Sequence, residues 1–163
     1  VVIQNLAMYA GALEPIDCND LGAHGYIIGD VQRRKVKLSF VEVCSREYRH
    51  ETVEVTESDT VFSIREKVAR TIHEGGSQHM YRLTLTGERD PQIRPDVREY
   101  MKCGRITEII DRTVPAFHLQ ELARRYRGQL IGKYIESFED GPKGIVEEKA
   151  LRYGLEALLY SEK

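Results

Sequence analysis

The residues of this sequence that most often bind metals or activate nucleophiles are its histidines and cysteines. They are His24, His50, His73, His79, His118, Cys18, Cys44 and Cys103. No two histidines have the spacing that places a metal pair on one helix or strand, and the cysteines show no C-x-x-C spacing. The motifs of zinc proteases, serine hydrolases and phosphate-binding loops do not occur either. The sequence therefore predicts neither a catalytic residue nor a metal site, and we expect each histidine at the surface or half-buried.

The densest run of basic side chains consists of Arg33, Arg34 and Lys35, with Lys37 close behind. It falls at a predicted turn between two strands, where it could meet a phosphate backbone, so these three residues are the candidate DNA-binding residues. A solvated turn without a partner is the alternative. Over the whole chain, 24 basic residues nearly balance 26 acidic ones. This balance argues against a basic nucleic-acid tail.

The composition also bears on where the protein works. Three cysteines are an odd number, which argues against a disulfide framework and favours a reducing cytoplasm. No apolar run approaches the roughly 18 residues that cross a bilayer, so no membrane association is expected, and no secretion signal is visible. The sequence begins with Val1 rather than methionine, within a predicted strand. This start suggests a fragment of a longer protein.

Residues 58–88 hold the most regular pattern of the sequence, a helix followed by a strand. Apolar residues at spacings of three and four predict an amphipathic helix, which Ser58 or Asp59 can cap and which Gly75 and Gly76 end. The apolar positions are Val61, Ile64, Val68 and Ile72. Beyond the helix, Tyr81, Leu83 and Leu85 alternate with polar residues. Neither element can bury its apolar face alone, so neighbouring segments must complete a sheet.

The segments on either side add strands and short helices. Residues 25–56 read as consecutive strands, residues 95–103 as a short helix and residues 105–114 as a strand. In the central region strands and helices alternate, and crossovers of this kind favour helices on one face of a sheet. We therefore predict the α+β class: a small mixed β-sheet with helices on one face, preceded by β-strands and followed by a C-terminal helical hairpin.

Two helical patterns follow Pro115, over residues 116–139 and 143–160. The first carries more apolar surface than one partner helix can cover. Its main stripe consists of Leu122, Tyr126, Leu130 and Tyr134. We predict that these four residues bind a partner protein. The alternative is that the hairpin only folds back on the preceding module.

Two strings within this order of elements resemble a known family. The strings NLAMYAGALEPIDCNDLGAHGYIIGDV and YRLTLTGE, joined by a strand-rich segment and followed by a helical hairpin, resemble the C-terminal part of SbcD-type DNA repair exonucleases. These enzymes belong to the metallophosphoesterase superfamily. By this resemblance, residues 1–35 are trailing strands of the phosphoesterase domain, residues 36–114 are the capping domain and residues 115–163 are the C-terminal helical hairpin.

The resemblance implies a manganese-dependent nuclease, a hydrolase that processes DNA ends with a coiled-coil ATPase partner of the SbcC type and can form a homodimer through its nuclease domain. The chain departs from the family at the metal site, because no H-x-H or N-H sequence occurs and Gly29-Asp30 lacks the acid that should follow. Two-metal hydrolysis needs several carboxylates and histidines around its ions. No catalytic residue is therefore transferred here. We expect a non-catalytic C-terminal fragment that positions DNA and docks the ATPase, without a cofactor of its own, while manganese belongs to the parent nuclease.

Two other function classes stay open. An independent α+β module could bind nucleic acid or protein with the face of its sheet that carries no helices. Binding single-stranded nucleic acid requires exposed aromatic side chains on adjacent strands, and Tyr48 and Tyr81 are the pair that could serve. The third class is a small enzyme whose site is spread over the fold without a sequence motif.

Overall fold

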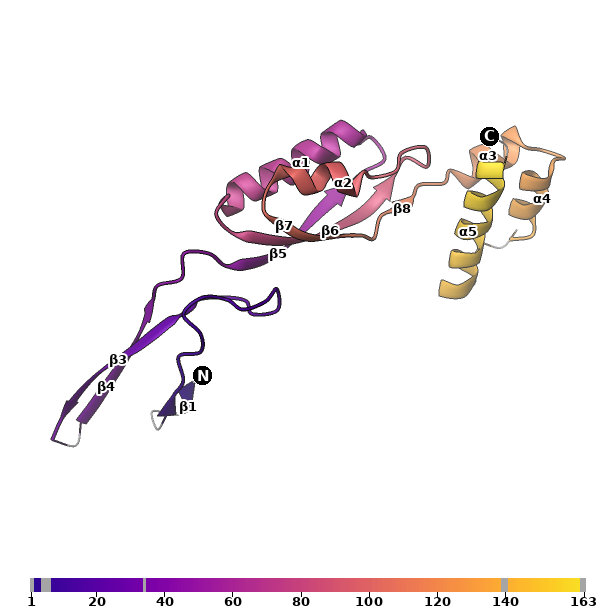
Figure 1. The fold of residues 1–163 in the computed structure, drawn as a ribbon. Helices are drawn as coiled ribbons and strands as arrows, with labels where there is room; N and C mark the ends of the chain where they lie inside the picture. Colours follow the sequence, from indigo (N-terminus) through magenta and orange to yellow (C-terminus); the bar gives the residue numbers. More distant parts are fainter. Residues whose placement is uncertain (1, 4–6, 34, 139–140, 162–163) are drawn as a thin grey trace.

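The chain folds into three parts that follow one another in sequence and in space (Figure 1). The computed structural model describes residues 2–3, 7–33, 35–138 and 141–161. An antiparallel hairpin comes first, then an α/β module in which helices cover a sheet, then a tail of helices. The hairpin and the tail lie at opposite ends of the module.

The N-terminal part is dominated by a two-stranded ribbon. Strands β3 (Gly25–Gln32) and β4 (Lys35–Glu42) pair antiparallel in unbroken register. The turn between them holds Arg33 at φ 48°, in the left-handed region that two-residue hairpin turns use. Ahead of the ribbon, β1 (Val2–Ile3) and β2 (Ala7–Met8) form a second, shorter antiparallel pair.

The module is a βαβαβ unit in which every strand runs parallel to its neighbours. Its elements are β5 (Tyr48–Val55), α1 (Val61–Gly75), β6 (Met80–Arg89), α2 (Val97–Tyr100), the 3-10 helix η1 (Met101–Cys103), β7 (Ile106–Asp111) and β8 (Val114–Pro115). Strand β6 is central, because β5, β7 and β8 all pair with it. The β7 pairing lies in the first half of β6, and the β8 pairing lies at its end, at Glu88 and Arg89. Both α-helices cover the same face (Figure 1). The α+β class is thereby confirmed, and its strands are divided between an antiparallel ribbon and a parallel sheet.

Helix α1 forms where the periodicity predicts it. Thr60 is the N-cap, one or two residues later than expected, and its side chain accepts a hydrogen bond from the Ser63 amide in a reciprocal capping box. Asp59 is instead buried beneath the first turn, where it accepts hydrogen bonds from Lys67 and Thr56. Burial opposes ionisation of Asp59, but these bonds outweigh it and hold the pKa of its carboxyl well below the usual range.

The module's core lies between α1 and the sheet. Three residues of the predicted stripe, Ile64, Val68 and Ile72, are buried there, whereas Val61 in the first turn of α1 is 41% exposed. Strand residues Val53, Val55, Tyr81, Leu83 and Leu85 face them, and Tyr100 of α2 and Ile106 of β7 complete the cluster. The end of α1 fits closely over the sheet, because a Cβ on Gly75 would lie 2.4 Å from the Tyr81 hydroxyl. A single core therefore holds α1, α2 and three parallel strands together.

The tail differs from the predicted helical hairpin. Its described residues, up to 138 and from 141 to 161, form three helices: α3 (Leu119–Arg125), α4 (Leu130–Glu136) and α5 (Ile145–Ser161). The expected first helix is interrupted at Gly128, whose φ of 79° lies in the left-handed region and ends the helical geometry. A second cluster, centred on Ile131, Leu151 and Leu155, packs α4 against α5.

The element boundaries also bear on the predicted division into parts. A boundary between residues 35 and 36 would cut the ribbon, because β3 and β4 are partners along their whole length. The parallel sheet begins at Tyr48 and its last strand includes Pro115, which pairs with Arg89 of β6. The helical tail therefore starts just beyond the sheet and is joined to it by a short linker.

None of the helices in the described ranges combines the length and the apolar character that crossing a bilayer requires.

Candidate binding sites

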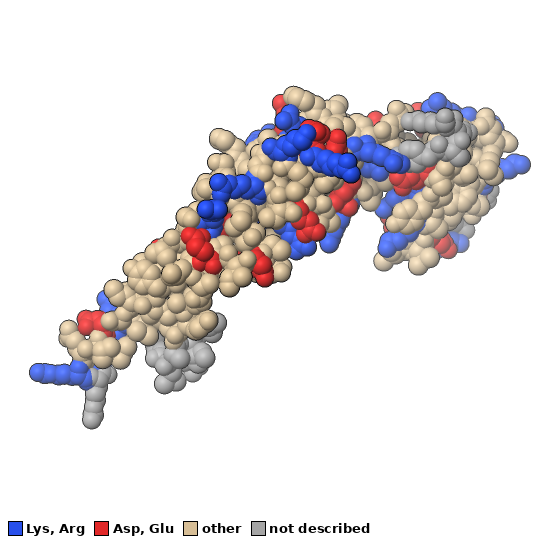
Figure 2. All heavy atoms as spheres, in the orientation of Figure 1, with Lys and Arg blue, Asp and Glu red and all other residues tan. Residues whose placement is uncertain are grey.

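The predicted basic cluster lies at the tip of the ribbon, far from the helices of the module (Figure 1). Arg33 lies in the turn, Lys35 begins β4 and Lys37 follows on the same strand, while Arg34 lies outside the described residues. Figure 2 shows blue atoms projecting from this end of the molecule. The side chains of Arg33 and Lys35 are exposed, so the turn can reach an extended anion.

One face of the same ribbon is apolar and open to solvent. Opposite residues of an antiparallel pair point to the same side, which places the pairs Ile27–Phe40, Gly29–Leu38 and Val31–Val36 on one face. We call Ile27, Val31, Val36, Leu38 and Phe40 the apolar ribbon face. Their side chains are half-buried or exposed, Val31 with 71% of its surface accessible and Phe40 with 40%. An isolated two-stranded hairpin is marginally stable, so this face needs a covering surface.

The rings of His24, His50, His79 and His118 each have a hydrogen-bond partner, and no histidine belongs to a group of potential metal ligands within the described residues. His24 is buried rather than half-exposed, and its ring lies 2.8 Å from the Gly22 carbonyl and 3.0 Å from Asp20. His50 contacts the Cys18 carbonyl oxygen at 2.7 Å. All three cysteines are free.

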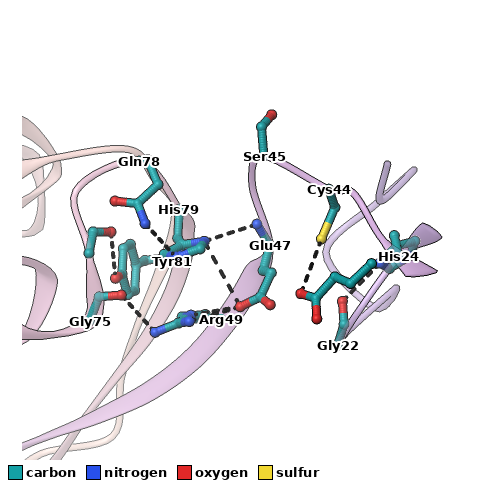
Figure 3. A network of polar contacts seen from close by, with 12 residues as sticks. Gly22, His24, Cys44, Ser45, Glu47, Arg49, Gly75, Gln78, His79 and Tyr81 are labelled. Atoms are coloured by element: carbon teal, nitrogen blue, oxygen red, sulfur yellow. Dashed lines mark hydrogen bonds and ion pairs between the residues drawn. The ribbon is translucent and has the colours of Figure 1, made fainter. Parts of the chain in front are cut away.

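A polar network of the module joins the start of β5, the end of α1 and the start of β6 (Figure 3). Arg49 donates to Glu47 Oε2 at 2.8 Å and to the Gly75 carbonyl at 2.6 Å, while the Glu47 amide donates to His79 Nδ1 at 3.0 Å. The Tyr81 hydroxyl donates to the Gly76 carbonyl at 2.9 Å. These bonds satisfy the terminal carbonyls of α1, so the network holds the helix to the sheet.

Three side chains beside this network have metal-ligand atoms within 4.8 Å of one another: Glu42, Cys44 and Glu47. The carboxylate of Glu47 already neutralises Arg49, and Glu42 is the contact of the Cys44 thiol at 3.8 Å. A cation placed among them would lie close to the Arg49 guanidinium, which repels it. The group is therefore a poor metal site as it stands.

A cavity of about 430 Å³ lies at the other end of the sheet, between the module and the tail. We call it the junction pocket. Its lining includes Glu57 just after β5, Asp90 just after β6 and Pro115 in β8, all at the carboxyl ends of parallel strands. Open parallel sheets bind ligands beyond the carboxyl ends of their strands. The polar network around Arg49, at the amino ends of β5 and β6, is thus structural. The junction pocket, at their carboxyl ends, has the position of a ligand site.

The lining of the junction pocket is part apolar and part charged, and we call its apolar residues the floor and its charged and polar residues the rim. The floor consists of Pro91, Pro115, Ala116, Phe117, Leu122, Tyr126 and Leu159. The rim consists of Glu57, Asp90, Glu121 and Glu156, with Gln92, His118 and Arg125 between them.

Two contacts tie the tail to the module across this pocket. His118 Nε2 lies 2.6 Å from Glu57 Oε1, and this hydrogen bond raises the pKa of His118 above its ordinary value. Behind the wall, the buried Arg89 lies 3.6 Å from Glu156 Oε1 and donates to the Ile93 carbonyl at 2.8 Å. Both contacts pair a residue of the module with one of the linker or tail.

The four predicted partner-binding residues do not form one stripe. The break at Gly128 separates Leu122 and Tyr126, which are half-buried and line the junction pocket, from Leu130, which is 68% exposed. Tyr134 packs in the tail cluster, and its hydroxyl donates to the Ala150 carbonyl at 2.8 Å. The expected continuous docking stripe was therefore wrong in its geometry, because helical spacing no longer relates residues on either side of the break.

The open face of the sheet does not supply the expected aromatic platform. Tyr81 is completely buried against α1, on the same side as Leu83 and Leu85. Tyr48, half-buried at the start of β5, is left without that partner. The requirement for stacking single-stranded nucleic acid on this pair is not met.

The pocket residues Glu57, Asp90, Glu121 and Glu156 were not identified from the sequence. A usable signal was present for the first two, because an acidic residue directly after a predicted parallel strand marks the carboxyl edge. Helix α5 contributes Glu156 to the pocket only because the tail packs beside the strand ends, and no local sequence pattern predicts this packing.

Comparison of the chain with protein families, with curated proteins and with solved structures found no match.

Proposed function

We propose that this chain is a non-catalytic interaction region of a DNA repair exonuclease subunit, in which the α/β module holds one binding element at each end. The observation that carries the proposal is the apolar ribbon face. Five apolar side chains on one side of a two-stranded ribbon are exposed or half-buried, and contiguous apolar surface of this kind marks a contact with another protein surface.

The resemblance to the SbcD family supplies the partners in this proposal. The ribbon packs against the nuclease domain of a longer protein, which holds the manganese and forms the homodimer. The basic turn at its tip positions DNA through the phosphates, and the helical tail binds the coiled-coil ATPase of the SbcC type. The free cysteines agree with the cytoplasmic location that the proposal includes.

The ribbon can be tested by comparing two protein contexts. Leu38→Ser with Phe40→Ser changes the apolar ribbon face, and Tyr26→Ser with Ile28→Ser is the matched control on the opposite face. In residues 1–163 alone, we expect each substitution of the first pair to lower the free energy of unfolding by at most about 1 kcal/mol, because Leu38 and Phe40 are each 40% exposed and belong to neither core cluster. In the longer protein each should cost about 2–5 kcal/mol, since the face is buried there.

Urea unfolding of both variants in both contexts measures the difference. An equal, small effect of the two variants in the longer protein would show that the face is not covered by the nuclease domain.

A further inference from the structure

We propose that the junction pocket binds an alkyl cation, meaning an aliphatic chain that ends in an ammonium or guanidinium group. A lysine or arginine side chain of a partner protein and a linear polyamine share this chemistry. The proposal goes beyond the proposed function and does not depend on it, because it concerns the carboxyl edge of the sheet rather than the ribbon.

The size and position of the pocket suit a ligand. Its volume of about 430 Å³ lies within the roughly 300–1,000 Å³ of small-ligand sites. It lies where Glu57 and Asp90 leave the parallel strands β5 and β6, the region in which such sheets bind ligands. The second wall comes from α3 and α5, so a bound molecule would contact the module and the tail together.

The floor of the pocket fits an aliphatic stem. Pro91 and Pro115 close it on the module side, and Leu122 and Leu159 close it on the tail side. Burying methylene groups against this surface is favourable by about 0.8 kcal/mol for each group. A compact inorganic cation would leave this floor unused.

The rim of the pocket selects positive charge. Four carboxylates outnumber the cationic groups near them, which are Arg125 and His118 in the lining and Arg89, whose guanidinium lies 3.6 Å from Glu156. Arg125 is also drawn toward Tyr126, with its guanidinium carbon 5.6 Å from the ring centroid. The Arg89 contact to Glu156 is 3.6 Å long, beyond hydrogen-bond distance, so that carboxylate can still accept a donor from a ligand. An anion would be repelled by the excess of negative charge.

Binding can be measured by NMR titration of the full chain with three probes. The first is Nα-acetyl-arginine methylamide, the second is spermidine, and the third is Nα-acetyl-citrulline methylamide, a neutral analogue with the same shape as the first. We expect the two cations to give saturable shifts at the amides that line the pocket, such as Gln92, Phe117 and Leu122. The citrulline analogue should bind at least about fivefold more weakly, because it lacks the charged hydrogen bonds.

Two variants separate the pocket from general surface charge. Glu121→Gln keeps the shape of the rim and removes one charge, and we expect it to weaken arginine amide binding at least about fivefold. Glu136→Gln, on the exposed face of α4 and outside the pocket lining, is the matched control and should leave binding unchanged. The urea midpoint of each variant checks that the tail stays folded.

Each outcome decides the proposal. Tighter binding of the arginine amide identifies the natural ligand as a protein side chain, and tighter binding of spermidine identifies it as a polyamine; both support the site. Absence of saturation with either cation, equal binding of the citrulline analogue, or equal effects of Glu121→Gln and Glu136→Gln would overturn it.

Discussion

At the scale of single residues, the pair His118 and Glu57 links the linker to the module. Both side chains are exposed, and their hydrogen bond favours the protonated imidazole. A pKa raised by folding adds stability that is complete below the unfolded pKa and is lost as pH rises through the folded pKa. The ordinary pKa of a histidine is 6.5. The link should therefore weaken as the pH rises from 6.5 through the raised pKa of His118.

We predict that NMR titration of the His118 ring in the native chain gives a midpoint above 6.5, and that Glu57→Gln lowers this midpoint. His24, whose raised pKa depends on the Gly22 carbonyl and Asp20, serves as the control, because Glu57→Gln changes neither partner. A His118 midpoint that is the same in both proteins would show that the pair does not form in solution.

The basic turn also acts at the residue scale. Under the proposed function, replacing Arg33, Arg34 and Lys35 by alanine in the longer protein should weaken DNA binding equally for all sequences, because phosphate contacts carry no base information. The slope of log K against log salt should become shallower by about 0.9 for each phosphate that the variant no longer neutralises. Fluorescence anisotropy at several salt concentrations measures both quantities. An unchanged slope would assign the cluster to a solvated turn.

At the scale of elements, the tail depends on a close approach of α4 to the backbone that follows α3. A Cβ on Gly132 would lie 2.3 Å from the Tyr126 carbonyl oxygen, a backbone atom that cannot rotate away. We predict that Gly132→Ala separates α3 from α4 at a cost of about 1–3 kcal/mol. Lys133→Ala, at the next and exposed position, should have little effect.

Hydrogen exchange of the two helices measures this change, with the amides of β6 as an internal reference for the module. Faster exchange in Lys133→Ala than in Gly132→Ala would contradict the packing described.

Elements with regular spacing were predictable, whereas interruptions were not. The stripe of α1 and the alternation of β6 each follow a period that packing enforces, and both were confirmed except at Val61, which lies exposed in the first turn. Gly128 lies between polar residues, where a glycine is compatible with a continuous helix as well as with a break. The sequence alone therefore did not distinguish one long helix from two short ones. The junction pocket depends on the seating of α3 and α5 against distant strand ends, a tertiary relation that local patterns do not contain.

At the scale of the whole molecule, the proposed function assigns different partners to the two ends. We predict that the longer protein co-purifies with its SbcC-type ATPase, and that a version ending at Pro115 loses this binding while the module stays folded. Pro115 is a suitable end point because β8 completes the sheet there. Circular dichroism and urea unfolding of the truncated protein check its fold. Equal recovery of the ATPase with both proteins would remove the tail as its docking element.

The attachment of the tail to β8 also determines how the molecule would respond to mechanical load. The ribbon joins the sheet at the amino end of β5, and the tail leaves it at the carboxyl end of β8, with β6 between them. A pull that separates the two ends would therefore run along the strand axes. Hydrogen bonds between parallel strands would be loaded in shear and would have to break together, rather than open one after another from an end. The module would thus act as a stiff mechanical link between the ribbon and the tail.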